Sequence, residues 1–117
     1  MKRTVLVFAA VVAAFVPVAV SAVGRISISG PATMRIGGAM SRISASTSST
    51  RLSLVGNTCY REPEASGDVL RKNHYGAGVY STGAIIAIDV WAKNPGTCTF
   101  TFESKGETNA ITITVAK

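Results

Sequence analysis

The chain has 117 residues, of which 47% are hydrophobic and 15% are charged, with two cysteines and a formal net charge of +6. This length allows a single ordinary domain, and the apolar content excludes a disordered chain. Two cysteines are too few for a small scaffold held together by many disulfides.

The N-terminus has the three regions of a secretory signal peptide. Two basic residues near the start precede an apolar run over residues 5–16, and small residues end the segment at Ala22. A membrane anchor is the alternative, but a spanning helix needs about 20 apolar residues and this run is shorter. The sequence therefore predicts a signal peptide over residues 1–22 and one mature domain over residues 23–117. It also predicts a secreted or periplasmic location, with no transmembrane segment in the mature form.

The first half of the mature region predicts short strands and no helix. Apolar residues alternate with serines from Ile26, and glycines at positions 37 and 38 break the next short run. No segment carries the apolar stripe at a spacing of 3.6 residues that marks an amphipathic helix. Residues 61–83 lose all periodicity, so we expect a long irregular excursion there.

The second half predicts strands more strongly. Cys98, Phe100 and Phe102 alternate with polar residues, and the run over residues 111–115 alternates in the same way, so each offers one apolar face. The short link between them predicts a hairpin with Gly106 at a position of positive φ. Residues 84–91 are apolar on both faces and predict a central strand.

The two cysteines predict one disulfide. In an exported chain, Cys59 and Cys98 are most simply paired, whereas a metal site needs more ligands and the chain holds one histidine. The closed loop spans 40 residues, which the chain-entropy model credits with about 4 kcal/mol. Two free thiols or an intermolecular bridge are the alternatives.

About seven short strands, no helix and one long-range cysteine pair indicate an all-β, two-sheet sandwich. The segments VWAKNPGTCTFTFESKG (residues 90–106) and ITITV (111–115) resemble the closing strands of the bacterial immunoglobulin-like modules of intimin and invasin-type adhesins. The opening segments ISISGP (26–31) and MRIGG (34–38) are similar to that family's first strand. The resemblance, limited to these first and last strands, implies an immunoglobulin-like sandwich and a binding role at a bacterial surface.

The irregular excursion contains the residues best suited to chemistry. His74 has Asp68 and Tyr75 nearby in sequence, and Glu62 and Glu64 stand on either side of a proline, as an acid–base pair or a weak Ca²⁺ site would require. A solvated loop explains the same residues. No nucleophile motif or phosphate-binding glycine loop accompanies them. We therefore predict no catalytic residues, no metal and no cofactor, and treat these five residues as a candidate functional loop.

Charge is distributed unevenly along the mature chain. Residues 23–61 hold five arginines and no acidic residue, whereas all six acidic residues follow. Four of these arginines precede an apolar residue and would point outward from a strand. They form a candidate anion-binding face: Arg25, Arg35, Arg42 and Arg51. Solubility and protection of strand edges is the alternative explanation.

These features favour a non-enzymatic binding or structural module of the bacterial envelope or the extracellular space. Its expected partner is a protein or an anionic glycan or lipid. Nucleic acid is disfavoured because the arginine-rich stretch holds one aromatic residue, Tyr60. The alternative is a small exported effector, either a protein inhibitor or a cationic antibacterial protein, that acts through residues 61–83.

Overall fold

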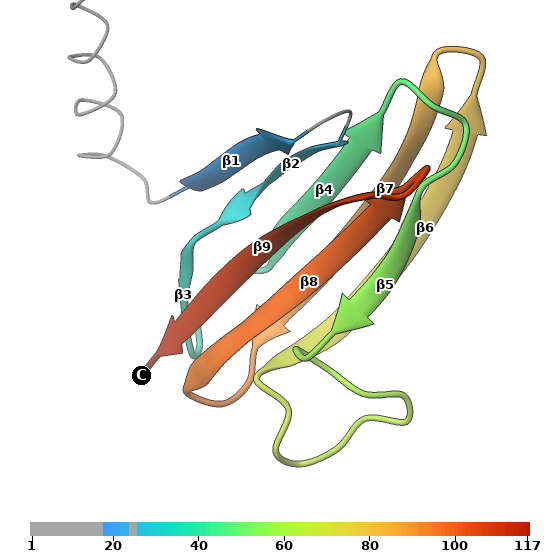
Figure 1. Ribbon diagram of the computed structural model, residues 1–117. Helices are drawn as coiled ribbons and strands as arrows, with labels where there is room; N and C mark the ends of the chain where they lie inside the picture. Colours follow the sequence, from blue (N-terminus) through green and yellow to red (C-terminus); the bar gives the residue numbers. More distant parts are fainter. Residues whose placement is uncertain (1–17, 24–25) are drawn as a thin grey trace, which may run out of the picture.

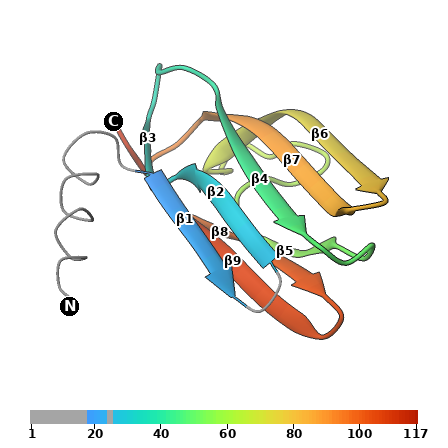
Figure 2. The ribbon, with the colours of Figure 1, turned by 90° about the horizontal axis from the view of Figure 1, so that it is seen from above.

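The computed structural model describes residues 18–23 and 26–117, which form two stacked β-sheets (Figure 1). Their strands are β1 (Val18–Val23), β2 (Ile26–Pro31), β3 (Thr33–Arg35), β4 (Ser41–Thr47), β5 (Ser53–Asn57), β6 (Leu70–Tyr80), β7 (Gly83–Ala92), β8 (Gly96–Ser104) and β9 (Glu107–Ala116). One sheet has the order β1-β2-β4-β7-β6 and the other β3-β9-β8-β5. Seen from above, the sheets form two layers (Figure 2). The predicted all-β, two-sheet sandwich is therefore confirmed.

The strand order is that of an immunoglobulin-like sandwich. From β2 onward, β2-β4-β7-β6 corresponds to the ABED sheet of that fold, and β5, β8 and β9 correspond to the CFG sheet. The short strand β3 pairs with β9 in parallel, whereas the other ladders are antiparallel. β7 lies between β4 and β6, as expected for a strand that is apolar on both faces.

The core lies between the sheets and follows from the period-two patterns. Phe100 and Phe102 of β8 are fully buried, as are Ile113 of β9 and Ile43 and Ile88 of the opposite sheet. The intervening threonines of β8 and β9 face outward, and the Thr99 and Thr112 hydroxyl oxygens are 3.0 Å apart across the ladder. Burying each of these large side chains stabilises the fold by about 1.5–3 kcal/mol.

The hairpin between β8 and β9 has the predicted chemistry. Lys105 and Gly106 both have positive φ, 52° and 83°. Two such residues in succession match the twist of antiparallel strands, and glycine adopts this conformation without steric cost. The turn therefore sets the register that buries every second residue of both strands.

The predicted disulfide is present and cross-links one sheet. Cys59 lies just beyond β5, Cys98 lies in the neighbouring strand β8, and their Cα atoms are 4.9 Å apart. Antibody domains instead place their disulfide between the two sheets. Here the bond continues the β5–β8 pairing past the point where β5 ends, and it holds the start of the following loop against the core.

The structure corrects the prediction for residues 61–83. Only the first part is irregular, because residues 70–80 form β6, the longest strand, paired with β7. The sequence pattern hides this strand because its register shifts between Lys72 and His74 and because it lies at the edge of the sheet. An edge strand has fewer buried positions, so its apolar periodicity is weak.

The predicted signal peptide lies largely outside the described residues, which begin at Val18. The last residues before its expected cleavage site belong to β1, which pairs with β2. No helix within the described ranges is long and apolar enough to cross a membrane.

Candidate functional site

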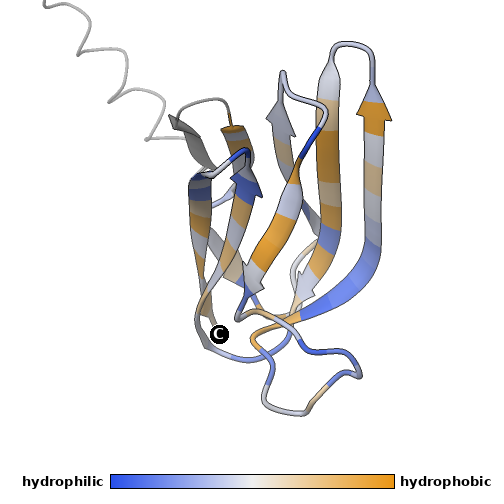
Figure 3. Cartoon of the chain, turned by 45° about the vertical axis from the view of Figure 1, so that its right-hand side comes forward, coloured by the Kyte–Doolittle hydropathy of each residue, from blue (hydrophilic) through white to orange (hydrophobic). Residues whose placement is uncertain are grey.

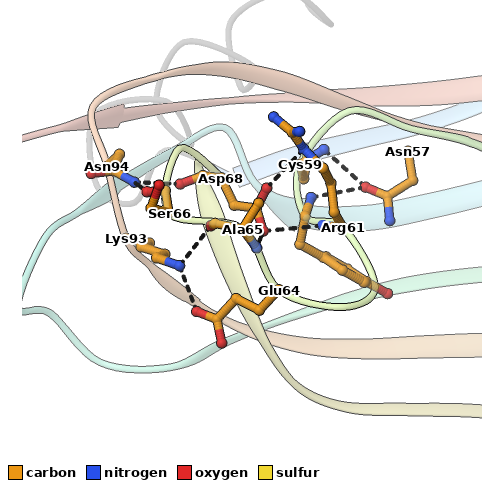
Figure 4. Close-up of polar contacts among 10 residues, drawn as sticks. Asn57, Cys59, Arg61, Glu64, Ala65, Ser66, Asp68, Lys93 and Asn94 are labelled. Carbon is orange, nitrogen blue, oxygen red and sulfur yellow. Dashed lines mark hydrogen bonds and ion pairs between the residues drawn. The ribbon is translucent and has the colours of Figure 1, made fainter.

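Asp68 organises the loop between β5 and β6 (Figure 4). Its carboxylate accepts hydrogen bonds from the backbone N–H groups of Arg61 and Ala65, at 3.1 and 2.9 Å, and pairs with the Arg61 guanidinium at 3.3 Å. The hydrogen bond from Ala65, followed by that from Arg61 and the charge of Arg61, lowers the pKa of Asp68. Asp68 is 4% exposed. Its carboxylate is therefore buried and occupied by contacts that hold the loop in place.

The turn between β7 and β8 fixes the same loop from the other side. The Lys93 ammonium donates to Glu64 at 2.6 Å and to the Ala65 carbonyl at 2.8 Å. The Asn94 side-chain amide donates to the carbonyls of Ser66 and Asp68, at 2.8 and 2.7 Å (Figure 4). Glu64 is thus paired with Lys93, and these contacts hold the loop over residues 61–69 in place.

Tyr60, which follows β5, contacts side chains of both β8 and β6. Its ring contacts Phe100 with centroids 6.0 Å apart, and the Lys72 ammonium lies 5.8 Å from its centroid. Lys72 also pairs with Glu62. Burial, together with the nearby Glu62 and Tyr75, raises the pKa of Tyr60 to about 12. The phenol therefore stays neutral at physiological pH.

A groove of about 660 Å³ opens between the edge strands of the two sheets. It has an aromatic and aliphatic part and a polar rim. Its lining, which we call the β5–β6 groove, comprises Leu54, Asn57, Tyr60, Glu62, Lys72, Asn73, His74 and Tyr75. Three residues of the candidate functional loop, Glu62, His74 and Tyr75, thus come together here. Glu64 and Asp68 instead make the contacts that hold the loop between β5 and β6.

The inward-facing side of β6 is not covered by the opposite sheet. Tyr75, Ala77 and Val79 pair across the ladder with residues of β7 that are at most 5% exposed. Paired residues project from the same face of a sheet, so these three side chains face the sandwich interior. Tyr75 is nevertheless 38% exposed and Val79 65% exposed. Figure 3 shows β6 changing from hydrophilic at its start to hydrophobic at its tip.

His74 lies on the opposite face of β6 from Tyr75, at the rim of the groove. It pairs across the ladder with Asp89, which is bound by Arg42. The Asp68 carboxylate is bound by Arg61 and Ala65 in the loop between β5 and β6, so it does not form an acid–base site with His74 of β6. No group of three or more histidine, cysteine or acidic side chains that could hold a metal ion occurs in the described part of the chain.

The candidate anion-binding arginines that the structure describes do not lie on one sheet face. Arg25 lies outside the described residues, Arg35 is on β3, and Arg51 follows β4 in the link to β5. Arg42 binds both carboxylate oxygens of Asp89, at 2.7 and 3.0 Å, and this hydrogen bonding lowers the pKa of Asp89. The charge of Arg42 is therefore balanced by Asp89, and anion binding by Arg25, Arg35 and Arg51 stays a prediction.

Several residues of the site are not predicted from the sequence. Leu54 and Tyr60 are distant from Tyr75 along the chain, and only the sandwich brings them to one groove. Arg71 stacks over the Trp91 ring at 4.3 Å because β6 and β7 place the two residues opposite each other. The groove and the Arg71–Trp91 contact both depend on β6 being a strand, which the sequence pattern does not predict.

No family model, curated protein or solved structure matches the chain.

Proposed function

We propose that the chain is an exported, non-enzymatic binding module that holds a protein partner in the β5–β6 groove. The observation that carries this proposal is the uncovered inward side of β6. Tyr75 and Val79 occupy positions that a sandwich normally buries, and both are exposed. Apolar side chains at such positions favour a partner that covers them.

The surroundings of the groove support binding more than catalysis. Glu62 is paired with Lys72, Glu64 with Lys93, and Asp68 with Arg61, so each acidic residue of the candidate loop has a charged partner. Tyr60 carries a raised pKa, which disfavours its use as a base. An aromatic floor with a polar rim is the usual composition of a protein contact surface.

Site-specific photo-cross-linking tests the proposal. A benzophenone amino acid is placed at Tyr75 in the groove or, as a control, at Thr112 on the outer face of the other sheet, and the chain is irradiated in the cells that export it. We expect a discrete protein adduct from position 75 and none from position 112. Adducts only from position 112, or none from either position, would contradict the proposal.

The identity of the cross-linked protein also separates the two function classes considered from the sequence. An inhibitor acting through residues 61–83 would use the same groove, because His74 and Tyr75 lie in it. An enzyme that loses activity on binding would favour the inhibitor. A structural or surface protein would favour the binding module.

A further inference from the structure

The four-stranded sheet ends one strand short of the sheet that it faces at the β5–β6 groove. β5 is the last strand of its sheet, and β6 is the last strand of the other. Both line the groove, and the inward side of β6 projects past it without a cover. Resting on the binding function proposed above, we propose that the partner contributes an extended segment that adds to β5 as a further strand.

The backbone of β5 suits this role. Its ladder with β8, which shifts register between Leu54 and Gly56, uses one edge of the strand, so the hydrogen-bonding groups on the other edge point away from β8. The exposed edge of a sheet is a template for a further strand. In this mode of recognition, main-chain hydrogen bonds supply affinity and side chains at alternate positions supply specificity.

The side chains opposite the added strand define its pattern. Tyr75, Ala77 and Val79 stand at alternate positions along β6 and face the space beside β5. Leu54 of β5 pairs with the buried Phe102 and so faces the same interior. A segment with apolar side chains at every second position would cover this surface, and its intervening side chains would face solvent.

Charge favours a different protein over a second copy as the source of the strand. Arg51 is exposed just before β5, where it shares a hollow with Lys105 and Glu103. At this end of β5, Arg51 and Lys105 place two cationic side chains beside the single carboxylate of Glu103. A second copy joined through β5 would bring residues 51–61 to this edge, and these residues contain no acidic side chain that could complement the charge. We infer that the partner segment carries an acidic residue at the end that passes Arg51.

A random peptide library tests this inference even before the partner protein is identified. Peptides of about twelve residues, displayed on phage, are selected on the chain purified from an exporting host. We expect enrichment of segments with alternating apolar residues and an acidic end. N-methylation of alternate backbone amides of the best synthetic peptide should abolish its binding, because the main-chain hydrogen bonds would be lost.

Matched variants locate the binding site. Tyr75→Ser should weaken peptide binding by roughly tenfold or more, whereas Tyr80→Ser should leave it unchanged. Tyr80 follows Val79 on β6 and pairs with Gly83, so it faces the outer side. Arg51→Gln should weaken binding more than Arg35→Gln, which removes the same charge from β3.

Three results would overturn the inference: no enriched peptide, binding that tolerates N-methylation, or equal effects of the Tyr75 and Tyr80 variants. Circular dichroism of each variant checks that the fold is retained. If cross-linking from position 75 succeeds while strand addition fails, the groove keeps its binding role and only this mode of recognition is wrong. If cross-linking also fails, the proposed function falls with it.

Discussion

Tyr75 of β6 and Ile88 of β7 lie directly opposite each other in the ladder and face the same interior, yet Tyr75 is 38% exposed and Ile88 is 0% exposed. The four-stranded sheet covers β7 and stops before it covers β6. The two residues therefore belong to the same layer of side chains but to different environments. This difference separates the core from the groove.

The pair should respond differently to truncation. Ile88→Ala is expected to lower the free energy of unfolding by about 2–5 kcal/mol, because it removes buried atoms and leaves a cavity. Tyr75→Ala should cost less than about 1 kcal/mol, as expected for a partly solvated side chain. Urea unfolding measures both values. Equal losses would mean that β6 is covered in solution.

The disulfide should contribute strongly to stability. Replacing both Cys59 and Cys98 by serine is expected to lower the free energy of unfolding by about 4 kcal/mol, because the unfolded chain regains the freedom of a 40-residue loop. Unfolding of the oxidised protein and of the variant gives the difference. The mass of the oxidised protein should be two hydrogens below that of the reduced protein, and an unchanged mass on reduction would show that no bond had formed.

The hold of the β7–β8 turn on the loop between β5 and β6 should depend on the side-chain hydrogen bonds of Asn94. Asn94→Ala removes two hydrogen bonds to loop carbonyls and is expected to cost about 1–2 kcal/mol of stability. It should also speed tryptic cleavage after Arg61 in the loop. Asn73→Ala, an exposed amide on β6 whose side chain contacts the Met40 sulfur at 3.2 Å and no part of the loop, is the control and should change both quantities less. Slow cleavage in the Asn94 variant would mean that other contacts hold the loop.

Stability should fall in acid because of Asp68 and Asp89. Their pKa values are lowered in the folded protein, so the unfolded state binds more protons as the pH falls. The stabilisation is complete above the ordinary aspartate pKa of about 3.9 and is lost as the pH drops through the lowered folded values. Arg42→Gln should flatten this dependence, whereas Arg35→Gln should not. Thermal melts between about pH 2 and pH 6 test this, and parallel profiles for the two variants would contradict it.

The fold could be predicted where one face of a strand is buried and the other is solvated. β8 and β9 have this pattern, and Gly106 marks their turn, so their apolar residues were identified as core from spacing alone. β6 could not be recognised in this way. Its inward side is largely exposed, and its register shifts beside His74, so neither face keeps a continuous apolar row.

The candidate site was predictable only in part. The carboxylate of Glu62 and the imidazole of His74, with Tyr75 beside it, mark these residues as candidates from the sequence, and all three line the groove. The partners of the charged residues were not predictable. Arg42 meets Asp89 because β4 and β7 pair in one register, and sequence spacing does not determine the register between distant strands.

Hydrogen exchange on the complex with the cross-linked partner tests the central claim most directly. Amide exchange across the chain is compared with and without the partner. We expect slower exchange in β5 and in residues 72–75, which line the groove, with little change in β2 and β4 at the far side of the sandwich. Protection confined to the outer threonines of β8 and β9, or no protection in β5 and β6, would contradict the β5–β6 groove as the binding site.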